Sequence, residues 1–193
     1  MDGYQNIPSS LQKMVQSELE SGESIIWMGM PKAEYFNAHS IGIFLFAIPW
    51  TAFSLFWIVG ASGFKVPDFN STDILFPLFG LPFVLIGVSM LLTPLRVYRN
   101  ALKTLYVITD RRVIIFEGGA NTTIRSYEVE RLNNITRYEK ENGYGDLIFD
   151  KEFKHKNIIN NIGFINIKDA KGVEQKIKQM IIRQERFKRF ERE

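Results

Sequence analysis

The chain has 193 residues, a formal net charge of +3 at pH 7 and no cysteine. The lack of cysteine excludes disulfides, thiolate catalysis and cysteine-ligated zinc or iron–sulfur sites. The positive charge is concentrated after residue 95, where 21 Lys or Arg face 14 Asp or Glu.

Residues 1–40 are predicted to form an ordered segment with one helix and one short strand. Ser9 and Gln12 fit a capping box, and Gly22 is expected to end the helix. Its apolar face would comprise Leu11, Met14, Val15 and Leu19. Residues 24–28 read as a strand, in which Trp27 could lie at the lipid headgroups or in a protein core.

Two apolar blocks, residues 41–60 and 74–95, contain no Asp, Glu, Lys, Arg or His. At about 1.5 Å per residue, each can cross a hydrocarbon layer of about 30 Å, so we predict a hairpin of two transmembrane helices. Buried helices of a soluble core are the alternative, but such helices seldom lack a polar face over this length. Prolines and glycines at 77, 80, 82 and 87 predict a kinked, closely packed second helix.

Charge placement predicts the orientation of these two helices. The short loop 61–73 has one basic residue, Lys65, whereas five follow the second block closely: Arg96, Arg99, Lys103, Arg111 and Arg112. Cationic residues favour the cytoplasmic side. We therefore expect a multi-pass protein with both termini in the cytoplasm and the loop outside.

Residues 96–193 are predicted to form a separate cytoplasmic domain. Short strand patterns recur over residues 102–109, 112–116, 122–129, 134–140, 146–150 and 163–167, and the polar stretch 151–161 reads as a loop. Asp110-Arg111 and Asn142-Gly143 are turn candidates. From Ala170 onward the period becomes helical, with Val173 and Ile177 on the apolar face. The expected fold is α+β, a roll of short antiparallel strands closed by a C-terminal amphipathic helix.

The first hairpin of this domain is apolar on both faces. Leu105, Val107, Val113 and Ile115 are expected to point one way, and Tyr106, Ile108, Ile114 and Phe116 the other. One face would fill the roll. The other would meet the N-terminal segment, the final helix or another subunit.

Three motifs in this order resemble the bacterial PH-domain (pleckstrin-homology-like) membrane proteins. Their residues are Glu23, Trp27, Gly29 and Pro31 before the first block; Thr104, Tyr106, Thr109 and Arg112 after the second; and Gly143 and Gly145 in a later hairpin. The resemblance covers roughly residues 20–185. It implies a PH-like roll next to two N-terminal transmembrane helices, in a bacterial inner membrane. It implies no reaction and no particular ligand.

No catalytic, metal or cofactor site is expected, because His39 and His155 lack the spacing of zinc ligands and complete no triad. Contacts to a headgroup or partner could come from Arg111 and Arg112 at the turn, and from Lys151, Lys154 and Lys156 in the polar stretch. For Arg112 we favour a structural role in fixing the turn. Mixed charge on the last helix argues against nucleic acid binding.

We therefore expect a non-enzymatic inner-membrane protein whose PH-like domain binds or scaffolds another protein. Its contact with anionic lipids should be non-specific and sensitive to salt, because the basic residues are dispersed. The expected docking surface is the outer face of residues 106–116. The alternatives are a homo-oligomeric subunit of a transport or channel assembly, and a lipid-sensing module.

Overall fold

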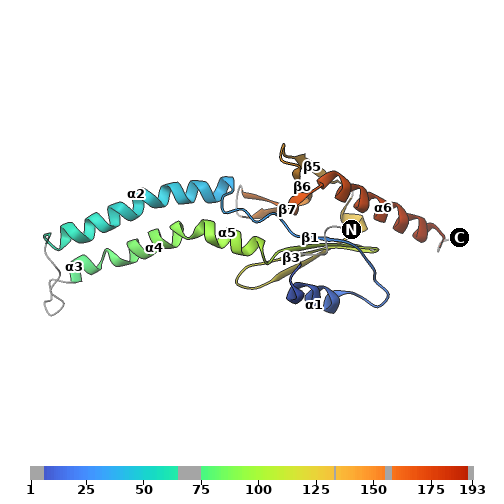
Figure 1. Cartoon of the computed structure of the whole chain (residues 1–193), viewed down its shortest axis with the longest axis horizontal. Helices are drawn as coiled ribbons and strands as arrows, with labels where there is room; N and C mark the ends of the chain where they lie inside the picture. Colours follow the sequence, from blue (N-terminus) through green and yellow to red (C-terminus); the bar gives the residue numbers. More distant parts are fainter. Residues whose placement is uncertain (1–6, 65–74, 133, 155–157, 191–193) are drawn as a thin grey trace. The chain divides into compact units, whose positions relative to one another are not determined.

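The structure, a computed structural model, describes residues 7–64, 75–132, 134–154 and 158–190, with side chains omitted at 38–39, 75, 152–154 and 158–160. The chain divides into two compact units. One is helical and comprises residues 34–98; the other combines residues 1–33 with 99–193. Figure 1 shows the helices of the first unit and the sheets of the second.

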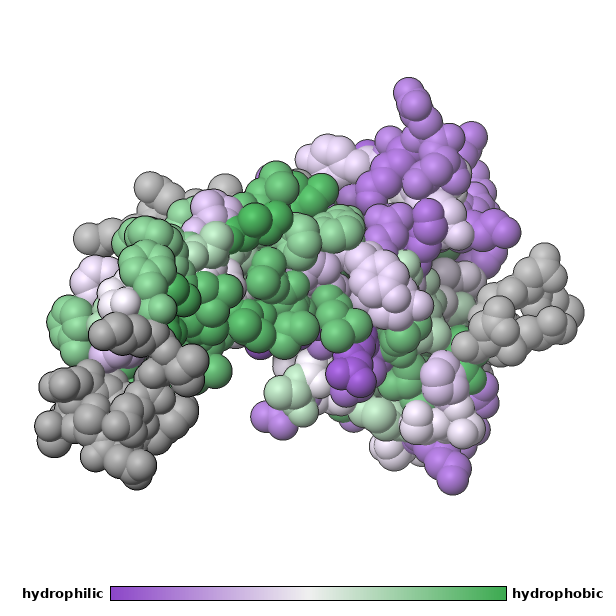
Figure 2. Space-filling model, turned by 60° about the vertical axis from the view of Figure 1, so that its left-hand side comes forward, coloured by the Kyte–Doolittle hydropathy of each residue, from purple (hydrophilic) through white to green (hydrophobic). Residues whose placement is uncertain are grey.

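The helical unit is built from the two apolar blocks. It contains α2 (Ala38–Ala61), α3 (Leu75–Leu78), α4 (Leu81–Leu91) and most of α5 (Thr93–Ala101). Ser40–Ala61 is long and apolar enough to cross a membrane, and the stretch from Phe76 to Ala101, bent by 40°, is a second candidate. Figure 2 shows a broad hydrophobic surface on this unit, coloured green.

The expected kink and close packing of the second block are confirmed. The chain breaks at Phe79 and Gly80, between α3 and α4, and bends again near Leu92. A Cβ atom on Gly80 would lie 2.5 Å from Ile58 Cγ1, and one on Gly87 would lie 2.2 Å from Thr51 Oγ1. Only glycine therefore allows the two helices to approach this closely at these positions.

In its described residues, the second unit has two antiparallel sheets, the helices α1 and α6 and the end of α5. One sheet has the order β1-β2-β3-β4 and the other β5-β6-β7. The elements are α1 (Ser9–Glu18), β1 (Ile25–Gly29), β2 (Leu105–Thr109), β3 (Arg112–Glu117), β4 (Thr123–Glu128), the 3₁₀ turn η2 (Val129–Arg131), β5 (Thr136–Glu139), β6 (Tyr144–Lys154), β7 (Ile158–Lys168) and α6 (Ala170–Phe190).

Strand β1 changes the expected domain boundaries. It precedes the helical unit in sequence, yet it pairs antiparallel with β2, with Met28 opposite Val107 and Gly29 opposite Tyr106. Residues 1–33 of the predicted N-terminal segment 1–40 and residues 99–193 of the predicted domain 96–193 therefore form one folded unit. The helical unit is inserted between two neighbouring strands of a single sheet.

The two faces of the β2–β3 hairpin are assigned differently from the prediction. The two-residue turn places Ile108 opposite Val113 and Val107 opposite Ile114. Residues opposite each other in an antiparallel pair point to the same face, so the predicted assignment of β3 was reversed. One face carries Leu105, Val107, Ile114 and Phe116; the other carries Tyr106, Ile108, Val113 and Ile115.

Both faces of this hairpin are buried within the chain. The first packs against α1 through Leu11 and Val15, in a cluster that also contains Met28. The second joins the other sheet and α6 in the larger core. The expected docking surface on the outer face of residues 106–116 is therefore wrong, because α1 covers that face.

Helix α6 closes the roll as predicted. Val173, Ile177 and Met180 are buried in the larger core, and Ile181 packs against it while partly exposed. A period of three and four residues places these side chains on one stripe. The first half of α6 is thus a core element of the unit.

Three local expectations need correction. Helix α1 has Pro8 as its N-cap with no side-chain cap, while the Gln12 amide donates to the Ile7 carbonyl at 2.9 Å, so the capping box is absent. The helix ends at Glu18, and Gly22 instead forms a turn with φ of 77°. The predicted loop 151–161 is largely strand, because β6 extends to Lys154 and β7 starts at Ile158.

Candidate functional site

The turn between β2 and β3 holds a buried ion pair. The Arg112 guanidinium donates from Nε to Glu23 Oε1 and from Nη2 to Glu23 Oε2, both at 2.9 Å. The Glu23 side chain is fully buried, and 15% of the Arg112 side chain is exposed. This paired, planar geometry is the strongest form of an Arg–carboxylate contact.

Neighbouring groups complete the bonding of this pair. The Thr109 hydroxyl donates to Glu23 Oε1 at 2.7 Å, and the Glu20 amide donates to Oε2 at 2.8 Å. Arg112 Nη2 also donates to the Glu18 carbonyl at 2.9 Å. Burial favours the neutral acid, but these donors outweigh it and hold the pKa of Glu23 below its ordinary value. The network joins the segment after α1 to the hairpin turn.

The structural role favoured for Arg112 is supported, although its partner is the distant Glu23 and not only the turn itself. Nε and Nη2 of Arg112 already bind protein oxygens, which disfavours the alternative of a headgroup contact, and that alternative remains a prediction. Arg111 is 45% exposed and lies 3.5 Å from Glu20. A surface hollow beside the turn is lined by Glu20, Arg111, Arg112, Glu128, Val129, Glu130, Gln184 and Lys188. Three carboxylates offset three cations there, which disfavours an anionic ligand.

The aromatic motif residues are also part of the core. Trp27 packs against the main core, with its ring 5.6 Å from Phe164, which settles its location in a protein core. A Cβ on Gly29 would lie 2.3 Å from the Trp27 ring, so the ring requires glycine at this position. Tyr106 stacks on Phe164 at 4.6 Å, and its hydroxyl accepts from the Ile165 amide at 3.2 Å.

The remaining motif residues shape the backbone. The Thr104 hydroxyl donates to the Asn100 carbonyl at 2.9 Å and accepts from the Gly118 amide at 3.1 Å. Gly143 has a φ of 76° in the β5–β6 turn. A Cβ on Gly145 would lie 2.6 Å from the Tyr138 carbonyl oxygen. Pro31 follows β1 and is partly buried.

The predicted lysine cluster is described only in part. Lys151 is an exposed residue of β6. Lys154 belongs to the same strand, but its side chain lies outside the described residues, as does Lys156. The headgroup or partner contact assigned to these three lysines remains a prediction.

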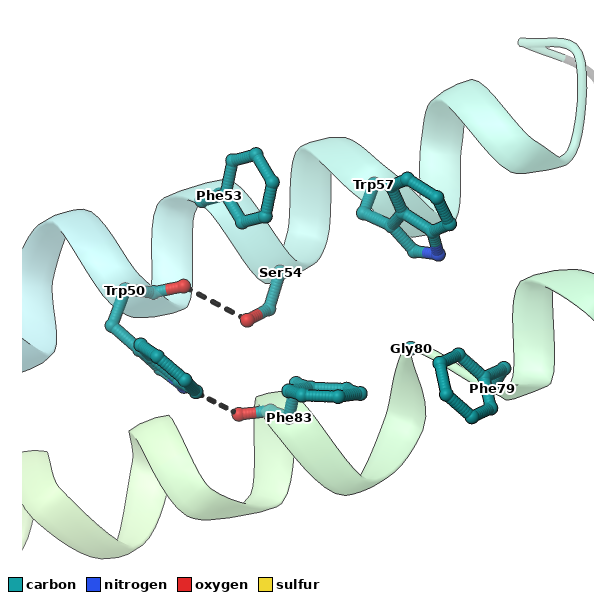
Figure 3. Close-up of a pocket in the computed structure, with 7 residues that line it drawn as sticks. All are labelled: Trp50, Phe53, Ser54, Trp57, Phe79, Gly80 and Phe83. Carbon is teal, nitrogen blue, oxygen red and sulfur yellow. Dashed lines mark hydrogen bonds between the residues drawn. The ribbon is translucent and has the colours of Figure 1, made fainter.

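An aromatic hollow between α2 and α4 was missed by the sequence reasoning. Its volume is about 250 Å³, and it is lined by Trp50, Phe53, Ser54, Trp57, Phe79, Gly80 and Phe83 (Figure 3). The spacing of Trp50, Phe53 and Trp57 by three and four residues could have revealed it, because such residues share one helix face. Phe79 and Phe83 supply the facing rings from the second block.

The distal half of α6 presents a second surface that the sequence reasoning did not identify. Ile182, Phe187 and Phe190 are exposed by 56%, 56% and 69%. Together with Gln179, Arg183 and Arg186 they line a shallow hollow of about 360 Å³. The buried stripe of α6 ends near Met180, so Phe187 and Phe190 lie beyond the core.

Among the described residues, no group of three or more His, Asp or Glu side chains is arranged to hold a metal ion. The side chain of His39 and the whole of His155 fall outside them.

Comparison with known proteins identifies one family. The family model described as a bacterial PH domain matches residues 41–181, most of the chain. No curated protein and no solved structure matches. The matched region starts within α2 and ends at Ile181 in α6, so it includes both apolar blocks and strands β2 to β7, but not α1 or β1.

Proposed function

The chain belongs to the bacterial PH domain family, and we propose that it is a non-enzymatic inner-membrane protein whose PH-like unit binds another protein. The apolar helices would hold it in the bilayer with both termini in the cytoplasm. The observation that carries the proposal is the exposed aromatic end of α6, where Phe187 and Phe190 are 56% and 69% exposed. Large exposed aromatic groups on an otherwise polar surface are typical of docking sites.

The chemistry of this surface indicates the kind of partner. Arg183 and Arg186 line the hollow with Phe187 and Phe190, and the Arg183 guanidinium lies 5.9 Å from the Phe187 ring centre. An apolar side chain flanked by carboxylates would be complementary to this arrangement. We therefore propose a protein segment with an apolar anchor and acidic neighbours as the partner.

Anchorage of α6 supports its use as a rigid platform. The Gln184 amide donates to the Asp110 carbonyl at 2.7 Å, and Lys188 pairs with Glu130. These contacts join the helix to the roll on either side of Arg186. A surface held in place loses less conformational entropy when a partner binds.

The test is affinity purification of the full-length protein from mild detergent, with the stoichiometry of each co-purifying protein measured. Phe187→Ser combined with Phe190→Ser should abolish recovery of a stoichiometric acidic partner. Tyr138→Ser is a matched control, because Tyr138 is 53% exposed on β5 and lies outside the hollow. Equal recovery with both variants would contradict the proposal.

The same preparation tests the transport-subunit alternative. If the protein is such a subunit, the native mass of the purified particle will correspond to a homo-oligomer without a foreign subunit. Lipid sensing is the less favoured alternative, because Arg112 is committed to Glu23 and acidic residues surround Arg111. We expect the protein to associate weakly with anionic vesicles, with little headgroup preference and loss of association at high salt.

A further inference from the structure

The hollow between α2 and α4 is lined almost entirely by apolar groups. The Ser54 hydroxyl donates to the Trp50 carbonyl at 2.8 Å, and the Trp50 indole nitrogen donates to the Phe83 carbonyl at 3.1 Å (Figure 3). The rest of the lining consists of aromatic rings and Gly80. Besides the Trp57 indole N–H, such a space gives water or a polar ligand few bonding partners, whereas a buried water typically makes about three hydrogen bonds.

The hollow is elongated along α2. Trp50 and Trp57 are seven residues apart on this helix, which corresponds to about 10 Å along its axis. Phe53 lies between them, and Phe79 and Phe83 face them from the second block. A row of rings on both sides is suited to a linear hydrocarbon more than to a compact molecule.

We propose that this hollow binds one acyl chain of a membrane phospholipid. The inference rests on the proposed membrane location, since the surrounding medium at that depth consists of acyl chains. The break at Phe79 and Gly80 separates α3 from α4 beside Trp57 and leaves Phe79 64% exposed. A chain lying across these rings would fill space that the two helices do not fill themselves and would gain dispersion contacts with them.

Fluorescence of the lining itself can test the proposal. The chain has three tryptophans, so Trp27→Phe leaves only Trp50 and Trp57, which both line the hollow. The full-length variant, stripped of lipid in detergent, is titrated with phosphatidylcholine whose acyl chains carry bromine, a contact quencher. We expect saturable quenching with a plateau at one lipid per chain, reversed by competition with unbrominated phosphatidylcholine.

Two neighbouring phenylalanines provide a matched pair of variants. Phe53 and Phe56 are 65% and 64% exposed, but only Phe53 lines the hollow. Since both are exposed, neither Phe→Ala change should prevent folding. Phe53→Ala should weaken lipid binding by roughly tenfold, as expected for loss of one buried aromatic contact, and Phe56→Ala should leave it unchanged.

Three results would overturn the assignment. The first is quenching that rises with lipid concentration without saturating. The second is equal lipid affinity of the Phe53→Ala and Phe56→Ala variants. The third is quenching that disappears at high protein concentration, which would mean that self-association occludes the hollow. The last result would assign the hollow to a second copy of the chain. Failure here is distinguishable from failure of the proposed docking function, which is measured with the α6 variants.

Discussion

Glu23 and Arg112 form a bidentate ion pair across 89 residues of sequence, with both N–O distances at 2.9 Å. The helical unit, residues 34–98, lies between them in the chain. The pair therefore joins the part of the roll that precedes the apolar blocks to the part that follows them. The pairing of β1 with β2 links the same two parts of the chain through backbone hydrogen bonds.

Replacing Glu23 should destabilise the roll strongly. Glu23→Gln removes the buried carboxylate and leaves Arg112 only the exposed Glu20 carboxylate at 3.8 Å, and breaking a buried pair typically costs about 3–5 kcal/mol. Glu20→Gln is the control, because the Glu20 side chain is 61% exposed and its pairing should contribute about 1 kcal/mol or less. Thermal unfolding in detergent compares the two. Similar melting temperatures would show that the pair contributes little.

The same pair predicts a dependence on pH. The pKa of Glu23 is lower in the folded protein than its ordinary value of 4.5, so folding is favoured wherever the carboxyl is ionised. This contribution is complete above the ordinary pKa and is lost as the pH falls through the lower, folded pKa. The melting temperature should thus decrease in acid, and less steeply for Glu23→Gln than for the parent protein. Parallel curves would contradict the assignment.

The roll should fold without the helical unit. Residues 1–33 and 99–193 contain both cores of the roll, so joining them by a flexible linker of about ten residues should give a soluble, cooperative unit. A fragment of residues 96–193 alone lacks α1 and β1 and would expose Leu105, Val107, Ile114 and Phe116. We expect that fragment to aggregate. Circular dichroism melts and gel filtration distinguish the two.

Pairing of β1 with β2 also constrains the membrane topology. The chain leaves the sheet after β1 and returns to it at β2, so the proposed membrane location requires both flanks of the helical unit to lie on the same side. Lys13→Cys and Lys188→Cys should therefore behave alike towards an impermeant thiol reagent, and the cysteine-free sequence gives no background. In intact cells neither should react, while Lys65→Cys should. Reaction of either in intact cells would reverse the orientation.

The closing helix offers a simple test of the core. Ile177 is fully buried, and Ile177→Asp would place an unpaired carboxylate there, at a cost above the roughly 1.5–3 kcal/mol of the lost apolar burial. Gln175→Asp, at an exposed position of the same helix, should be nearly neutral. Lys178 is a poor control, because it pairs with the largely buried Glu174. Equal melting temperatures for the two aspartate variants would refute the packing of α6.

Much of this architecture follows from the sequence because it depends on local patterns. The uncharged blocks 41–60 and 74–95 predict long apolar helices, and the stripe of Val173 and Ile177 predicts a helix packed on a core. Asp110-Arg111 predicts the hairpin turn. Each signal lies within a few residues, so a single sequence suffices to detect it.

The candidate sites required the tertiary structure. Glu23 reaches Arg112 because β1 pairs with β2, although the helical unit separates these strands in sequence. A local periodicity of apolar residues cannot indicate such a long-range pairing. Packing of α1 on the outer face of the hairpin likewise removed an expected docking surface. The sequence determined which segments are apolar and which are helical or extended. Only long-range packing decided which of their faces stay exposed, because burial depends on what the rest of the chain brings against them.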